Sequence, residues 1–506
     1  MEASEALKYR PFLIDPQLGG MGASSFHVWH VIASILDGDG NDLSADDLAL
    51  AHLISQRTRF PTEPITEFYA GPGRRSGKTR FGECRARYRL AQDYRDKLAP
   101  GEYAIAACVA PTTEQAQILF NYARAAVMQS PLLSAQVVRE TATEIEFAHR
   151  TLLKVYAGSF RSTRGMTFCA VFIDEASFLR SDDSALPDVE LVRAVKPGLL
   201  TLNGDLIVMS SPYMKRGLMF EAHRKHFGNN DSRALYVTGD SRTFNPLLDD
   251  NAIRQAFEDD PESAAAEFGG NFRADLSAAF AAEWIERAVC SGVFARARVA
   301  VTPQGAFPAY VSFTDPAGGS GRDSWTTSVV HMEHDDILQD AVLEIRPPFT
   351  TTEAAKQVAE FLKSYGLRST RGDAYAGAWP RDALALHGIG YTQSELPKSD
   401  IYRECVALFS GGRVKILDHA RQTTQLRMLE RRTRAGGKDS FDHPAGSNDD
   451  IANSLCGALL AASRTGASKE EVWSGRSAMA DSLIEMGVAQ NDYSHMYITG
   501  RSRFPN

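Results

Sequence analysis

Residues 68–80 read FYAGPGRRSGKTR, and this stretch decides how the first half of the chain folds. It ends in Gly77-Lys78-Thr79, which is typical of a phosphate-binding loop, where backbone N–H groups of a glycine-rich turn surround the phosphates of a nucleotide. We expect Lys78 to reach the β and γ phosphates and the Thr79 hydroxyl to bind Mg²⁺. The helix that begins there would turn the positive end of its dipole toward the anion.

The spacing of this loop is unusual. The pattern G-x-x-x-x-G-K-[ST] places a glycine where this chain has Pro72, between Gly71 and Gly73. Two arginines fill the loop and could pair with a γ-phosphate through forked hydrogen bonds. A basic glycine-rich turn without a ligand is the alternative interpretation. The candidate nucleotide contacts are Gly73, Arg74, Arg75, Ser76, Gly77, Lys78 and Thr79.

Length and composition describe a globular chain of more than one domain. With 506 residues, 43% of them apolar and 23% charged, the chain exceeds one ordinary core, so two or three domains are expected. We find no apolar run long enough to span a membrane, and the first ten residues, MEASEALKYR, lack the apolar region of a secretory signal. No membrane partner is therefore expected.

The cysteines and the net charge narrow the function classes. The six cysteines are scattered without a C-x-x-C pair, which favours reduced thiols and argues against a zinc ribbon or a disulfide framework. The net charge of −8 does not support nucleic-acid binding by the chain as a whole. Any contact with DNA must come from local basic patches.

Two further apolar runs end in polar residues. CAVFI at 169–173 is followed by Asp174 and Glu175, of which the first could hold Mg²⁺ through water and the second could polarise the attacking water. A strand followed by a capped helix would look the same, but the upstream loop favours the nucleotide site. LIVMS at 206–210 ends in Ser210-Ser211, where a motor can sense the γ-phosphate; a simple turn is the alternative.

Strands and helices alternate around these motifs. We expect a helix from Arg80 to about Leu98, a strand at 103–109, a helix to about Met128 and a hairpin of 143–147 with 152–156. Such alternation predicts a doubly wound α/β domain whose ligands gather at the carboxyl ends of the strands. From about 244 to 278 the pattern becomes helical and acidic, as in a linker or small subdomain.

The second half carries acids at three separated points. YVSFT at 310–314 predicts a strand that ends in Asp315, followed by a glycine-rich turn and an antiparallel strand at 326–332, which is how an RNase H-like sheet begins. Asp373 precedes a short helix, and Asp449-Asp450 precede an apolar helix to about Ser463.

If these acids converge, they could hold two divalent ions, one to activate water and one to stabilise the leaving oxygen of a phosphodiester. Each acid also has a purely structural interpretation: Asp315 as a turn residue, and Asp373 and Asp449 as helix caps. His443, beside Asp442, is interpreted as a loop residue rather than a metal ligand.

A basic helix is expected from about Arg421 to Arg434. Together with Lys438 it is the best local patch for a phosphate backbone, although a solvated face with Glu430 as its partner is equally compatible. The tail beyond residue 465 contains a short predicted helix, Glu470 to about Met486, and a basic end, Arg501-Ser502-Arg503, that could dock a partner.

From about residue 55 to 465 these motifs together resemble the large terminase subunit of tailed double-stranded DNA bacteriophages. GRRSGKT at 73–79 is similar to that family's arginine-containing phosphate loop, VFIDEAS at 171–177 to its metal-binding strand, and Ser210-Ser211-Pro212 to its coupling motif. Ser162-Thr163-Arg164-Gly165 also matches. The chain lacks the first glycine of the usual loop, and which of Asp449 and Asp450 binds metal directly stays open. By this resemblance the nuclease ligands would be Asp315, Asp373, Asp449 and Asp450.

The resemblance implies an α/β fold with two catalytic domains. These would be a P-loop ATPase of the additional-strand type, with a parallel-rich sheet, and an RNase H-like nuclease with a mixed sheet. The expected division is an N-terminal extension (1–55), the ATPase (56–245), a linker or lid (246–300), the nuclease (301–465) and a tail (466–506).

The same resemblance implies a packaging motor and its partners. ATP hydrolysis would move double-stranded DNA into the procapsid, and a two-metal endonuclease using Mg²⁺ or Mn²⁺ would cut concatemers. Partners would be the portal protein, a small terminase subunit and further copies in a ring, commonly of five, although the free chain could be a monomer. It would act in the host cytoplasm, on the procapsid but not in the mature virion.

Two other functions remain open. A P-loop helicase or remodelling ATPase, whose second half binds but does not cut nucleic acid, predicts that Asp315, Asp373 and Asp449 do not converge. A scaffold that uses nucleotide only structurally predicts that Glu175 is dispensable.

Overall fold

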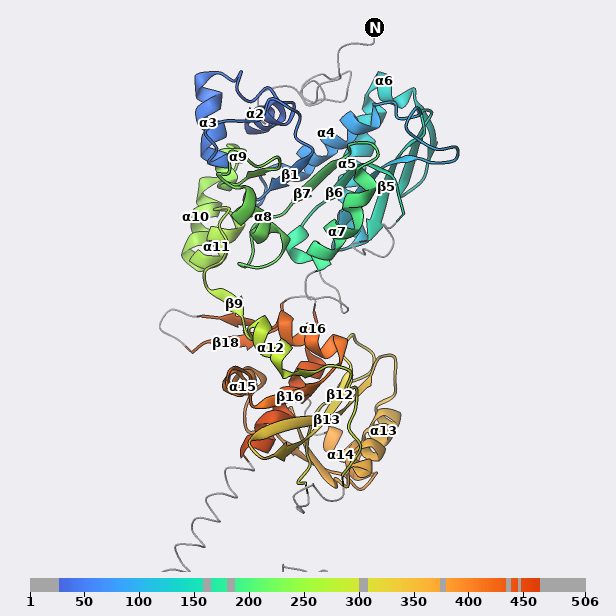
Figure 1. Cartoon of the computed structure of the whole chain (residues 1–506), viewed down its shortest axis with the longest axis vertical. Coiled ribbons are helices and arrows are strands. Elements are labelled where there is room, and N and C mark those ends of the chain that lie inside the picture. The colour runs from blue at the N-terminus through green and yellow to red at the C-terminus, as the bar shows by residue number, and fades with distance from the viewer. Residues whose placement is uncertain are drawn as a thin grey trace, which may run out of the picture. The chain divides into compact units, whose positions relative to one another are not determined.

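The computed structural model of the chain describes residues 27–157, 165–179, 187–299, 308–373, 379–433, 438–444 and 447–464 (Figure 1). The chain divides into two compact units, Met1–Ser277 with Arg431–Lys438, and Ala278–Glu430 with Asp439–Asn506. The division into five segments at residues 55, 245, 300 and 465 stays a prediction. None of the helices in the described ranges has the length and apolar character needed to cross a membrane.

The first unit is built on an eight-stranded sheet of order β3-β4-β5-β2-β6-β7-β1-β8. From β5 to β8 every neighbouring pair is parallel, and the predicted hairpin of β4 with β5 is confirmed as antiparallel. Its strands are β1 (Glu67–Ala70), β2 (Ala104–Ala110), β3 (Val137–Glu140), β4 (Glu144–Phe147), β5 (Thr151–Ala157), β6 (Phe168–Ile173), β7 (Asp205–Met209) and β8 (Leu235–Val237).

The position of β7 identifies the sheet type. It lies between β1, which leads into the phosphate-binding loop, and β6, which ends at the two acids. This extra strand is the mark of the additional-strand P-loop arrangement, so that part of the predicted fold is confirmed.

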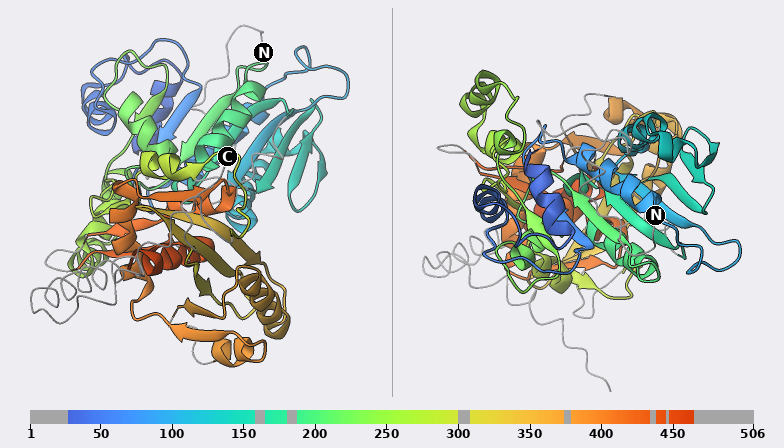
Figure 2. Two further views of the ribbon diagram at one scale, coloured as in Figure 1. Left: turned by 60° about the horizontal axis from the view of Figure 1, so that its bottom comes forward. Right: turned by 90° about the horizontal axis from the view of Figure 1, so that it is seen from above.

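Helices cover both faces of this sheet (Figures 1 and 2). In β2, Ala104 and Ala106 belong to a core shared with α2, α4 and α5, whereas Ile105 and Ala107 belong to one shared with α7 and α8. Such strands are apolar throughout because neither face meets water. The helices are α2 (His27–Leu36), α3 (Ala45–Ser55), α4 (Lys78–Leu90), α5 (Thr113–Gln129), α6 (Pro131–Ser134), η3 (Ala176–Phe178), α7 (Pro187–Leu199), α8 (Leu218–His226), α9 (Ser241–Phe244), α10 (Asp250–Asp259) and α11 (Pro261–Glu267).

The second unit contains a seven-stranded mixed sheet of order β10-β16-β13-β12-β11-β14-β15. Strands β11, β12 and β13 form an antiparallel meander, and β14 and β15 run parallel to β11, which is the RNase H-like topology that was predicted. Its strands are β10 (Val289–Cys290), β11 (Val311–Asp315), β12 (Trp325–Glu333), β13 (Asp336–Ile345), β14 (Ser369–Gly372), β15 (Gly390–Gln393) and β16 (Val414–Leu417).

Helices also cover both faces of the second sheet. One core joins Phe313 of β11 to α15 and to the helix 450–464, and another joins Trp325 of β12 to α13 and α14. A third, short sheet has the order β18-β17-β9. The remaining elements are α12 (Ala282–Ala288), α13 (Thr351–Ser364), α14 (Trp379–Ala385), α15 (Lys398–Ser410), α16 (Ala420–Met428), β9 (Leu276–Ala278), β17 (Glu430–Arg432) and β18 (Ser440–Asp442).

Two predicted helices were too long. Helix α4 ends at Leu90 rather than near Leu98, because the Asp93 carboxylate accepts the N–H of Arg95 and forms a local turn that competes with the helix. The basic helix predicted to Arg434 ends at Met428. Leu429 is extended, its carbonyl accepts the N–H of Ala279, and β17 follows.

The basic patch is therefore not one helix face. Arg421 is buried and paired with Glu344, and Arg427 pairs with Glu286 at 3.0 Å. Arg431 and Arg432 lie on strand β17, and Arg434 lies outside the described residues, as do the predicted tail helix and the basic C-terminal end.

Candidate nucleotide and metal-binding sites

The loop between β1 and α4 has the backbone of an anion-binding turn. Gly77 caps the helix in the left-handed region, with φ 88°, which glycine adopts without a steric penalty. Gly73 is needed for close packing, because a Cβ there would lie 2.6 Å from the carbonyl oxygen of Phe268. A Cβ at Gly71 would likewise meet the Tyr236 hydroxyl, so close packing favours a glycine on either side of Pro72.

Lys78 points into this loop. Its Nζ donates to Ser211 Oγ at 3.0 Å and to the carbonyls of Pro72 and Gly73 at 3.5 Å. Burial lowers the pKa of Lys78, while the carboxylates of Glu175 and Asp174 act in the opposite direction. The buried ammonium thus lies where an anion could replace weak carbonyl contacts with stronger charge-assisted hydrogen bonds.

Thr79 and Asp174 bring two oxygen donors together. Thr79 Oγ1 donates to Asp174 Oδ2 at 2.9 Å. Burial and the neighbouring charge of Glu175 raise the pKa of Asp174 to about 6. A hydroxyl and a buried carboxylate, with no nitrogen or sulfur between them, are the ligand types that Mg²⁺ prefers, so these residues fit that ion.

Glu175 and the two serines complete the site at the carboxyl edge of β1, β6 and β7. Glu175 adopts a left-handed conformation, with φ 50°, directly after Asp174. Ser210 Oγ donates to Glu175 Oε2 at 3.4 Å and accepts the N–H of Ser177 at 3.2 Å. Ser211 therefore contacts the loop lysine while Ser210 contacts the acid, so the strand end predicted to couple the site touches both motifs.

The two loop arginines are exposed. Arg74 pairs with Glu267 of α11 at 3.2 Å, and Arg75 has a positive φ of 60°. Of the segment Ser162-Thr163-Arg164-Gly165, only Gly165 lies within the described residues.

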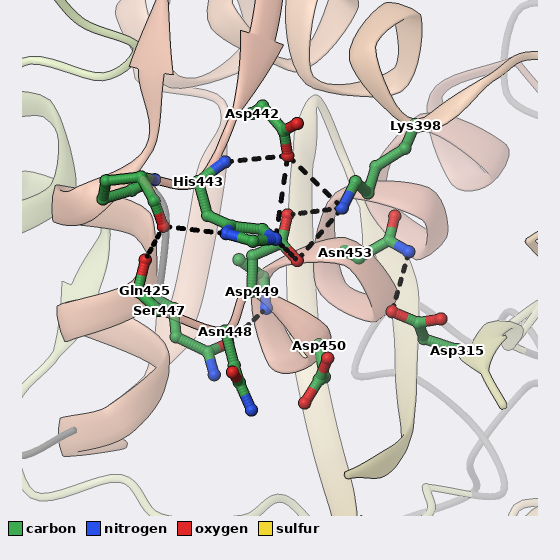
Figure 3. Close-up of polar contacts among 12 residues, drawn as sticks. Asp315, Lys398, Gln425, Asp442, His443, Ser447, Asn448, Asp449, Asp450 and Asn453 are labelled. Atoms are coloured by element: carbon green, nitrogen blue, oxygen red, sulfur yellow. Dashed lines mark hydrogen bonds and ion pairs between the residues drawn. The ribbon is translucent and has the colours of Figure 1, made fainter. Parts of the chain in front are cut away.

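In the second unit, Asp315 and Asp373 meet. They end β11 and follow β14, which are neighbouring parallel strands paired through Thr314 and Gly372. Asn453 Nδ2 donates to Asp315 Oδ2 at 2.8 Å and to Asp373 Oδ2 at 3.2 Å (Figure 3 shows the first). A cavity of about 740 Å³ lies here, and its lining includes Asp315, Asp373, Asp442, His443, Asp449, Asp450, Asn453 and Lys398.

Asp449 lies beside the Lys398 ammonium and the His443 ring (Figure 3), and it also contacts the Tyr402 hydroxyl. Lys398 Nζ lies 3.1 Å from Asp449 Oδ2, and the Tyr402 hydroxyl donates to the same oxygen at 2.7 Å. His443 Nε2 lies 3.8 Å from Asp449 Oδ1, and Lys398 also lies 3.5 Å from Asp442. His443 is in a loop, as predicted, but Asp442, His443 and Asp449 present donor atoms within 4.8 Å of one another.

Asp450, the next residue, has different partners. Its Oδ2 accepts the N–H of Ser324 at 2.8 Å, and its carbonyl accepts the Thr326 hydroxyl at 2.6 Å. Both anchors hold the start of the helix 450–464 against β12.

Electrostatic repulsion is concentrated in this cavity. Burial, followed by the charges of Asp450, Asp449 and Asp373, raises the pKa of Asp315 well above its usual range. Burial and the charges of Asp323 and Asp449 raise the pKa of Asp450 to about 7. The buried Asn453 Oδ1 has no partner among the described residues. Closely spaced carboxylates and a free amide oxygen fit hard divalent ions.

The sequence did not point to three residues that contact the acids of this cavity. Asn453 stands four residues after Asp449, a spacing that places both on one helix face, but no role could be assigned to it. Lys398 and Tyr402 have the same spacing on α15, a helix for which we had no prediction.

No family model and no curated protein sequence matches the chain. Among solved structures, it is similar to the large terminase of bacteriophage HK97, with 14% identity over 90% of this chain and 98% of that one, at a TM-score of 0.41. A large terminase from a thermophilic bacteriophage is 11% identical over 78% and 93% of the chains, at 0.34. The large terminase nuclease of the thermophilic phage G20c is 17% identical over 36% and 96%, at 0.29. The fold itself is identified by strand order and direction.

Proposed function

We propose that this chain is the catalytic subunit of a viral DNA-packaging motor, with an ATPase in the first unit and a metal-dependent DNA endonuclease in the second. One observation carries the proposal. A single chain holds both a phosphate-binding loop facing a pair of acids on an additional-strand sheet and an RNase H-like sheet whose acids share one cavity.

In the ATPase, Lys78 and the loop amides would bind the β and γ phosphates of ATP, and Thr79 and Asp174 would hold the metal. Mg²⁺, when bound, would neutralise phosphate charge. Glu175 would orient and polarise the attacking water, with its carboxylate 3.4 Å from the Ser210 hydroxyl. Ser211, through Lys78, would report the loss of the γ-phosphate to β7.

In the nuclease, Asp315, Asp373, Asp449 and Asp450 are the proposed ligands. Bound Mg²⁺ or Mn²⁺ would activate water and stabilise the leaving oxygen of a phosphodiester. The residues of the chain position these acids: Asn453 holds Asp315 and Asp373 together, while Lys398 and Tyr402 orient Asp449. Because both carboxylates already accept hydrogen bonds from the protein, Asp449 and Asp450 are ligand candidates of equal standing.

The proposed partners follow from the resemblance to phage large terminases. They are double-stranded DNA, the portal protein, a small terminase subunit and further copies of this chain in a ring, commonly of five. The chain would work in the host cytoplasm and on the procapsid.

The helicase-like alternative expects the acids of the second half to lie apart. Asp315 and Asp373 instead share one amide nitrogen, and Asp449 and Asp450 line the same cavity. A domain that only binds nucleic acid has no need for buried, mutually repelling carboxylates. This favours the nuclease.

The test is plasmid cleavage by the purified chain with Mg²⁺ or Mn²⁺, compared with Asp315→Asn. Asp335→Asn, in the exposed turn between β12 and β13, is the matched control. We expect cleavage by the wild type and the control and none by Asp315→Asn. If the folded wild-type chain leaves the plasmid intact whether Mg²⁺ or Mn²⁺ is supplied, the nuclease proposal is contradicted and the helicase-like alternative is favoured.

A further inference from the structure

We propose that Trp29, on the N-terminal helix α2, is a positioning residue of the phosphate-binding loop, acting together with Ser241 and Asn245. The three side chains would form an outer brace that turns the loop amides toward the nucleotide. This inference rests on the nucleotide site proposed above. It also assigns a role to part of the N-terminal extension, for which the sequence had suggested none.

Trp29 contacts the loop directly. Its indole Nε1 donates to the carbonyl oxygen of Ser76 at 2.8 Å, and both residues are completely buried. The ring packs against Phe81, one turn into α4, with centroids 4.5 Å apart, and against Phe244 of α9 at 5.2 Å. The indole therefore lies between the loop, the helix that follows it and α9.

The carbonyls of the two preceding loop residues also accept hydrogen bonds from side chains outside the loop. Ser241 Oγ donates to the carbonyl of Arg74 at 2.6 Å, and Asn245 Nδ2 donates to the carbonyl of Arg75 at 2.8 Å. Three successive carbonyls, of residues 74, 75 and 76, thus each accept a hydrogen bond from a side chain outside the loop. The donors come from α2 and from the segment around α9, which are far apart in sequence.

Because peptide groups are planar and trans, these hydrogen bonds to the carbonyls determine the direction in which the loop N–H groups point. In a trans peptide the C=O of one residue and the N–H of the next point in opposite directions. Holding the carbonyls of Arg74, Arg75 and Ser76 outward therefore directs the N–H groups of Arg75, Ser76 and Gly77 to the other side. Successive inward N–H groups are what an anion-binding turn requires.

The alternative is that Trp29 serves only to fill the core. Trp29→Phe separates the two roles, because phenylalanine keeps an aromatic ring against Phe81 and Phe244 but removes the N–H donor. Trp325→Phe is the matched control. Trp325 is also fully buried and donates its Nε1 to Thr314 Oγ1 at 2.8 Å, but in the second unit.

The experiment measures ATP turnover and ADP binding by calorimetry for the full chain and both variants. We expect Trp29→Phe to raise the KM for ATP and the Kd for ADP about tenfold, with a much smaller change in kcat, because a buried carbonyl loses its outer donor and the loop amides lose their orientation. Trp325→Phe should leave both constants unchanged. A purely structural role would lower the melting temperature in both variants without this split.

The outcomes separate this inference from the proposed function. If the wild type hydrolyses ATP and Trp29→Phe has wild-type KM and Kd, the brace is overturned and the ATPase stands. If the wild type binds no nucleotide, both fail. Should Trp29→Phe not fold, Asn245→Ala decides, since it removes another brace donor from a partly exposed position. Unchanged ADP binding in that variant would overturn the brace.

Discussion

At the scale of single residues, buried charges hold the first unit together as well as serving its site. Asp205, at the start of β7, is completely buried and accepts hydrogen bonds from Arg89 Nε at 2.8 Å and Arg85 Nη2 at 3.2 Å. Burial alone would raise the pKa of Asp205, but the two guanidinium groups hold it below its usual range. The carboxylate is the charge partner of two buried cations.

We predict that Asp205→Asn lowers the free energy of unfolding by about 3 kcal/mol at pH 7, because two buried guanidinium groups lose their counter-charge. The pKa of Asp205 is lower in the folded than in the unfolded chain, so its contribution is complete above the ordinary carboxyl pKa and disappears as the pH falls. The difference between wild type and variant should therefore be constant from about pH 5 upward and shrink below about pH 4. Urea unfolding measures it.

Asp231→Asn is the control for this prediction. Asp231 also pairs with an arginine, Arg59, at 2.6 Å, but the two side chains are 83% and 69% exposed. Its loss should cost less than about 1 kcal/mol. Equal effects of the two variants would mean that burial of the Asp205 pair contributes nothing.

A second prediction concerns Lys398, the lysine that lines the acidic cavity of the second unit. Lys398 lies close to both Asp449 and Asp442, so its ammonium already neutralises part of the charge that a divalent ion would neutralise. We expect Lys398→Met to lower the Mn²⁺ concentration for half-maximal binding about tenfold, because a repelling positive charge is removed from the ligand cluster. Calorimetry with MnCl₂ measures this, and Lys356→Met on the exposed face of α13 is the control. Weaker metal binding in Lys398→Met would contradict this prediction and show that the contact orienting Asp449 matters more for the ion than the repulsion.

At the scale of elements, the sequence pattern correctly predicted the strands whose formation depends mainly on their own residues. The buried strands around 104–110, 168–173 and 205–209 are almost continuous apolar runs. As expected, the acids and serines lie at the carboxyl ends of the last two of these strands. By contrast, the hairpin between β12 and β13 turns at His334 and Asp335 without the Asn-Gly or Asp-Gly signal that marks such turns. The loss of helix after Met428 depends on pairing with distant residues, which no local pattern contains.

The same distinction applies to the sites. That Lys78, Thr79, Asp174 and Glu175 lie together could be predicted, because each belongs to a short sequence motif at the end of a strand. Trp29, Lys398 and Asn453 contact Ser76, Asp449 and Asp315 only after folding, across separations of 47, 51 and 138 residues. Supporting residues of this kind have no spacing rule.

Helix 450–464 gives a prediction at this scale. A Cβ at Gly457 would clash with the Phe313 ring of β11, with Cδ1 only 2.5 Å away and Cγ closer still, so glycine allows the helix to approach the sheet and places Asp449 and Asp450. In an ordinary helix Gly→Ala stabilises by about 1 kcal/mol, but here we expect Gly457→Ala to destabilise by about 2 kcal/mol through overpacking. Thermal unfolding and Mn²⁺ binding should both deteriorate.

Gly390→Ala in β15 is the comparison for that variant. The nearest atom to a Cβ at Gly390 is 3.5 Å away, an ordinary contact, so metal binding should be unaffected. A stabilised Gly457→Ala with normal metal binding would show that the helix has room to spare at this position.

At the scale of the whole molecule, each proposed activity is built within one unit. The nucleotide site uses residues from 29 to 267, and the acidic cavity uses residues from 315 to 453, each supported by its own hydrophobic cores. The two chemistries should therefore be separable by point substitutions. Both proposed reactions would use divalent ions, so EDTA should stop both.

We predict a double dissociation between Glu175→Gln and Asp315→Asn. Glu175→Gln keeps the side-chain shape and its contact with Ser210 but removes the carboxylate, so ATP turnover should fall at least about 100-fold while ADP binding and plasmid cleavage persist. Asp315→Asn should abolish cleavage and leave ATP turnover intact. Normal turnover in Glu175→Gln would instead support a nucleotide-dependent scaffold, because a motor cannot run without hydrolysis. A fall of ATP turnover in Asp315→Asn would show that the nuclease site controls the motor, and independence of the units would be wrong.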